Sequence, residues 1–185
     1  MKYFIYILSF LTPFLSFAIS DTEMNDLVSD FYKTTYKYDT LIAYHSHIKL
    51  SQEQEIEFAI ISLDRLLDNP KKYSLDYQFK ISKLEIFLDN VDSDRIPLKC
   101  VPTLFKALKI GSAMLTADVI IIDLLDRIVG NNPGYTMQYL EKNNFNNTER
   151  LALINKWEEN FKHNREHILK KRQYKNKYYG KRVAK

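Results

Sequence analysis

The sequence predicts an all-α protein of about seven helices, arranged as antiparallel hairpins in a bundle or in a short α-solenoid-like array. Glycine and proline are scarce, at 4 and 5 of 185 residues, whereas an all-β fold needs many tight turns. Apolar residues recur at spacings of three, four and seven along most of the chain, which is the period of amphipathic helices. The length suits a single domain with a substantial core.

Residues 1–20 differ from the rest and are expected to be a cleaved signal peptide. Lys2 is the only charged residue, residues 3–17 are almost wholly apolar, and signal-peptidase cleavage fits after Ala18 or after Ser20. An uncleaved anchor is the alternative, but the apolar run is shorter than the roughly 20 residues of a membrane span. We therefore expect the mature chain to be periplasmic or extracellular.

The next segment predicts two helices with almost nothing between them. The apolar residues from Thr22 to about Leu50 follow a helical period and indicate one long amphipathic helix. Residues 51–54, SQEQ, fit a capping box, which predicts a second helix from Ser51 until Asn69-Pro70 ends it. Helices joined so closely are expected to pack as an antiparallel hairpin.

The central helix of the core is expected at Ser112–Gly130. Its apolar side chains cover well over half of the helix circumference, which indicates neighbours on several sides. Its charged residues exclude a membrane span, and Gly130 with Pro133 beyond it predicts the C-terminal end. Before it, a helix is expected from about Leu75 to Asn90, and a shorter one starting at Pro102.

The last part of the chain changes in charge. A short helix at Tyr135–Lys142 and a last helix from about Thr148 complete a helical domain expected at 21–169. A basic tail follows at 170–185. Residues 161–185 hold ten Lys or Arg against one acid, a net charge of +9, while the remainder of the chain carries −5. The helix pairs resemble a HEAT-type array in shape only, since no repeat aligns residue by residue.

Partner-binding residues are expected in the basic tail and on the first helix. Charge segregation of this kind points to a charged partner, and tyrosines bury much area at little cost in entropy. The expected contact residues are Tyr32, Tyr36, Lys170, Lys171, Arg172, Tyr174, Lys175 and Tyr178. A solvated helix end whose lysines serve only solubility is the alternative.

These features favour an exported, non-enzymatic protein that binds another exported protein and neutralises or escorts it, such as a toxin-immunity or inhibitor protein. Charge segregation would speed and orient such an association. An anionic membrane surface is the alternative partner of the basic tail. Nucleic acid is not expected, because a secreted protein rarely meets it.

A cell-envelope hydrolase or metal-dependent enzyme is the alternative of another class. The residues that would serve it are Asp118, Asp123, Asp126, His163 and His167. A solvated face for the histidines and an interaction with the helix dipole for Asp118 explain them better than catalysis does. No GxGxxG or GxxxxGK[ST] motif occurs, so no cofactor is expected. Cys100, the only cysteine, is expected to be a buried small hydrophobe.

Overall fold

The computed structural model describes residues 19–33, 50–69, 71, 74–110, 115–136, 138, 142 and 147–183, of which 32–33, 115–118 and 174–183 are described by their backbone alone. In these segments the chain forms six α-helices and two 3₁₀ turns and no strand, which confirms the all-α class. The expected signal peptide lies almost wholly outside the described residues, as does half of the short helix expected at 135–142.

Helix α4 begins where the sequence predicts it. α4 spans Gln52–Leu67 and is capped by Ser51, whose hydroxyl accepts a hydrogen bond from the Gln54 amide at 3.3 Å. The Gln54 side chain accepts in return from the Ser51 amide at 2.8 Å, so the capping box is confirmed. The next helix, α5 (Leu75–Asp89), starts with Ser74 as its N-cap.

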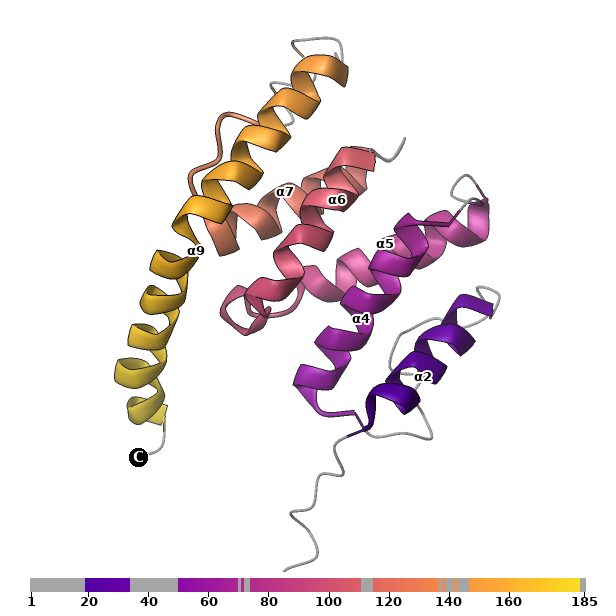
Figure 1. The fold of residues 1–185 in the computed structure, drawn as a ribbon, viewed down its shortest axis with the longest axis horizontal. Coiled ribbons are helices and arrows are strands. Elements are labelled where there is room, and N and C mark those ends of the chain that lie inside the picture. Colours follow the sequence, from indigo (N-terminus) through magenta and orange to yellow (C-terminus); the bar gives the residue numbers. More distant parts are fainter. Residues whose placement is uncertain are drawn as a thin grey trace, which may run out of the picture.

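The described part of the first expected helix is α2, Asp21–Lys33, and residues 34–49 lie outside the described residues. α2 contacts α4, and the two run in the same direction (Figure 1). Near the end of both helices, Ser29 accepts a hydrogen bond from Arg65 at 2.9 Å. α2 and α4 therefore do not form the antiparallel hairpin that the sequence predicts for the first two helices.

Four of the helices form two hairpins that stack on each other. α4 packs on α5, and α6 (Val101–Ile110) packs on α7 (Leu115–Val129). α4 also contacts α6, and α5 also contacts α7, so the two hairpins lie in register as two layers (Figure 1). Two 3₁₀ turns, η2 (Ser93–Arg95) and η3 (Leu98–Cys100), carry the chain from α5 to α6. Stacked helical hairpins are the local arrangement of α-solenoids.

The centre of the fold is α6, whereas the sequence pointed to the helix that follows it. α6 contacts α4, α7 and the last helix, and its residues Leu104, Phe105 and Leu108 are completely buried. α7 buries Ile121, Leu124, Leu125, Ile128 and Val129, but its Val119 is 44% exposed. α7 ends as predicted at Gly130, which has a positive φ of 65°.

The last helix, α9, spans Asn147–Val183 and crosses the expected boundary at residue 170 without a break. It contacts α6 and runs along one edge of the molecule, and its C-terminal end extends beyond the hairpins (Figure 1). Within the described segments, no helix combines the length and the apolar character of a membrane span.

Candidate partner-binding surface and pocket on α9

One stripe of side chains on α9 packs against the rest of the protein, and this stripe contains fewer buried residues toward the C-terminal end of the helix. Trp157 and Phe161 are buried, and Trp157 lies edge-on to Phe105 of α6 with ring centroids 5.7 Å apart. From Lys162 to Gln173, by contrast, only Ile168 is buried. The stripe keeps the spacing of three, four and seven that the sequence predicts, but its second half holds much less of the core.

Two side chains of α9 donate hydrogen bonds to backbone carbonyls at the ends of the neighbouring helices. Arg150, in the first turn of α9, is buried and donates to the carbonyls of Leu108 and Lys109 at the end of α6. Trp157 donates from Nε1 to the carbonyl of Gly130, just after α7, at 2.8 Å. Helix ends leave carbonyls without partners inside the helix, so these donors fix α9 to both helices.

Arg172 acts in the same way further along α9. Its guanidinium donates to the carbonyl of Ile96 at 2.6 Å and to that of Ser93 at 2.9 Å, beside η2. The guanidinium is half-buried, and burial lowers its pKa from the ordinary arginine value. The sequence predicts Arg172 as a partner contact, but the structure engages it within the chain. Arg172 therefore positions α9 and adds little to the free basic surface.

Lys170 and Lys171 are exposed, and neither forms an ion pair with another residue whose side chain is described. Arg165 and Leu169, which the sequence interpretation missed, are exposed close to them, Leu169 by 40%. The signal for these two was available, because positions 165 and 169 are one turn apart and lie off the buried stripe. These four exposed residues are spread around the part of α9 that lies off the buried stripe, with the acid Glu166 exposed among them, and we call them the α9 surface.

The side chains of the other expected contact residues are not described by the structure. Tyr174, Lys175 and Tyr178 belong to α9, whose backbone is helical there, and their side chains are outside the description. The same holds for the side chain of Tyr32 in α2, and Tyr36 is among the residues that the structure does not describe. Figure 1 places α2 and α9 at opposite edges of the molecule. The position of Tyr32 is therefore not part of the α9 surface.

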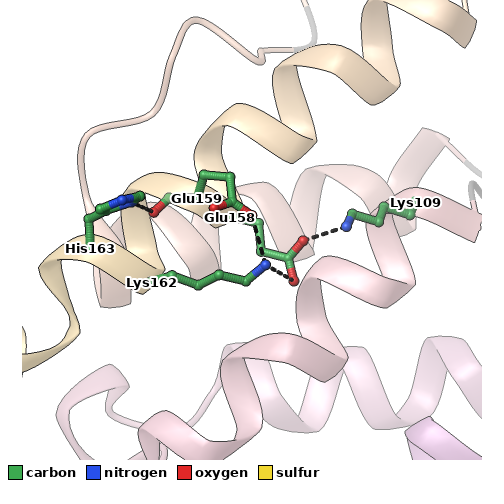
Figure 2. A network of polar contacts seen from close by, with 5 residues as sticks. All are labelled: Lys109, Glu158, Glu159, Lys162 and His163. Carbon is green, nitrogen blue, oxygen red and sulfur yellow. Dashed lines mark hydrogen bonds and ion pairs between the residues drawn. The ribbon is translucent and has the colours of Figure 1, made fainter.

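Ion pairs connect α9 to α6 on one flank (Figure 2). Lys109 of α6 pairs with Glu158 of α9, and Lys162 lies 2.8 Å from Glu159 and 3.9 Å from Glu158. The contact with Lys162 lowers the pKa of Glu159, and Glu159 in turn raises the pKa of Lys162. Nδ1 of His163 lies 2.7 Å from the carbonyl oxygen of Glu159, one turn earlier in the helix.

The residues considered for a metal-dependent enzyme form no metal-binding group among those whose side chains are described. His163 and His167 are both exposed, and one ring nitrogen of His163 is engaged by the helix backbone. Asp123 pairs with Arg127 at 3.0 Å, and the side chain of Asp118 is outside the description. Among the residues with described side chains, no group of three His, Cys, Asp or Glu is placed to hold a metal ion.

A pocket of about 330 Å³ lies between the C-terminal end of α7, the η2 turn and α9. Asp126 lines it from α7, His167 and Lys171 line it from α9, and Asp94 and Arg172 line it beside η2. Small-molecule sites span about 300–1,000 Å³, so this pocket has the size of a single small ligand or side chain. The sequence interpretation considered Asp126, His167 and Lys171 separately, and the fold brings them into one cavity.

Cys100 is buried, as predicted, with 3% of its surface exposed. Burial raises the pKa of its thiol to about 11. Since the thiolate is the reactive form of cysteine, Cys100 is almost entirely in its unreactive form at neutral pH.

Comparisons with protein-family models, with curated proteins and with solved structures find no match to this chain.

Proposed function

We propose that the chain is an exported helical protein that acts by binding and not by catalysis, and that it neutralises or escorts another exported protein, as an immunity or inhibitor protein does. The observation that carries the proposal is the division of α9 into an attached stripe and an exposed basic surface. Arg165, Lys170 and Lys171 are exposed there without an ion pair to another described side chain. The partner would present an acidic patch.

The attachment of α9 supports binding because it orders the surface in advance. Trp157 and Arg172 hold the helix on either side of the exposed residues through hydrogen bonds to the body. A surface that is already ordered loses less conformational entropy when a partner binds. Leu169, 40% exposed among basic residues, offers an apolar contact of the kind that lies inside a polar rim at interfaces.

Charge segregation supports an acidic partner. The net charge of +9 over residues 161–185 lies on a chain whose remainder carries −5. Such a distribution orients the encounter with an acidic protein and raises the association rate at low salt. The same charge would attract anionic lipid, so the experiment has to separate these two partners.

The test is capture of an exported protein by immobilised, purified protein from the exported fraction of the source cells. The variant Lys170→Glu/Lys171→Glu reverses two charges on the α9 surface. The matched control, Lys71→Glu/Lys142→Glu, reverses two exposed lysines elsewhere and has the same net charge. We expect one stoichiometric partner, retained by the control and bound at least about tenfold more weakly by the α9 variant.

Two outcomes would overturn the proposal. Equal loss of the partner in both double variants would mean that net charge alone drives the association. If no exported protein is captured while phosphatidylglycerol vesicles bind the wild-type protein, the membrane-surface interpretation replaces it. If the protein captures no exported protein and binds no vesicles, the proposal is also wrong, and the basic residues form a solvated helix end that serves solubility.

A further inference from the structure

The two walls of the pocket between α7 and α9 carry opposite charges. On the α7 wall lie the Asp126 carboxylate and the last turn of the helix, whose carbonyls form the negative end of the helix dipole. On the α9 wall lie the Lys171 ammonium and the His167 imidazole. Neither Asp126 nor Lys171 is in an ion pair with any residue whose side chain is described, and they do not pair with each other.

The remaining charges of the pocket are already engaged within the protein. Arg127 pairs with Asp89 at 2.7 Å and with Asp123 at 3.0 Å. Arg172 donates to carbonyls beside η2 and interacts electrostatically with Asp94. One negative charge, on Asp126, and one positive charge, on Lys171, are therefore left to be matched by a ligand.

Apolar residues line the pocket between these charged walls. Ile128 and Val129 contribute from α7 and Ile168 from α9, each at most 9% exposed, and Asn131 and Asn164 also line the pocket. A volume of about 330 Å³ is at the small end of the range for ligand sites. The ligand that fits these features is small, carries both an ammonium and a carboxylate group, and has an aliphatic part.

We propose that this pocket binds a zwitterionic α-amino acid with an aliphatic side chain. The ammonium group lies against Asp126 and the end of α7, and the carboxylate group lies against Lys171. Each charged group of the ligand then forms a charge-assisted hydrogen bond, stronger than a neutral one. This site goes beyond the proposed function and does not depend on it: the two share Lys171, but the pocket also needs Asp126 and the end of α7, which are not part of the α9 surface.

The test is isothermal titration calorimetry of the purified protein with L-leucine and L-alanine. N-acetyl-L-leucine lacks the ammonium group and L-leucinamide lacks the carboxylate group, so each removes one charge of the zwitterion. We expect saturable binding of L-leucine, weaker binding of L-alanine, and at least about tenfold weaker binding of each modified leucine. Equal affinity for all four compounds, or no heat with L-leucine, would overturn the proposal.

Matched variants identify the two walls. Asp126→Asn and Lys171→Gln each weaken L-leucine binding by about tenfold or more, whereas Asp26→Asn on α2 and Lys156→Gln on α9 leave it unchanged. All four positions are exposed, so we expect unchanged melting temperatures. If Asp126→Asn and Lys171→Gln bind L-leucine as the wild type does, the pocket is not the site. Unchanged protein capture by Asp126→Asn separates this result from the proposed function.

Discussion

The two halves of α9 follow the same helical period, yet the first half contributes most of the side chains that α9 buries in the core. The first half buries Arg150, Trp157 and Phe161 and caps the end of α6. The second half, beyond Lys162, buries Ile168 and uses the Arg172 guanidinium as its other attachment. The difference shows that a helix can remain attached to the protein where its apolar stripe ends. One buried aliphatic side chain and one arginine hold the second half of α9 in place of the several buried side chains of the first half.

The largest expected effect is in the first half. Trp157→Ala removes the edge-on contact with Phe105 and the hydrogen bond to the Gly130 carbonyl, so we expect a loss of about 3–5 kcal/mol in the free energy of unfolding. Urea denaturation followed by far-UV circular dichroism measures it. Trp157→Phe, which keeps one aromatic ring but loses the donor and part of the buried ring volume, should cost less, about 1–3 kcal/mol. A loss below about 1 kcal/mol for the alanine variant would place the first half outside the core.

A smaller effect is expected at the second attachment. Arg172→Gln removes the guanidinium that donates to the Ser93 and Ile96 carbonyls, and the half-buried position limits the expected loss to about 1–2 kcal/mol. The amides of Arg95 and Ile96, which donate within the η2 turn, should exchange hydrogen faster. Lys170→Gln is the neutral control. Unchanged exchange in Arg172→Gln would show that the second half of α9 is held without this arginine.

Local features of the fold were predictable because they depend on residues close in sequence. The Ser51 and Gln54 capping box, the end of α7 at Gly130 and the buried stripe of α9 all follow from spacings of three to seven residues. The relative direction of α2 and α4 and the central place of α6 were not predictable. They depend on which helices meet in space, and a long apolar run such as that of α7 indicates burial without giving its neighbours.

The candidate site was predictable only in part, for the same reason. Basic charge at Lys170 and Lys171 can be read from the sequence, and the structure places both residues on the exposed side of α9. The role of Arg172 cannot be read, because its acceptor at Ile96 is 76 residues away. The pocket cannot be read from the sequence either, because it forms only where the end of α7 faces α9. This arrangement makes Asp126 and Lys171 line the same cavity.

The smallest expected effect concerns the exposed ion pair at the junction of the two halves. Lys162 stabilises the protein mainly through its contact with the ionised Glu159, and this contact lowers the pKa of the Glu159 carboxyl group in the folded state. A lowered folded-state pKa stabilises the protein above the unfolded pKa, and this contribution is lost as the pH falls through the lowered folded-state pKa. The melting temperature of Lys162→Gln should therefore be slightly below that of the wild type at pH 7, and the difference should shrink as the pH falls toward 3. High salt should remove the difference at pH 7, because exposed pairs are screened. A difference that persists at pH 3 would assign the effect of Lys162 to packing on α9 and not to its charge.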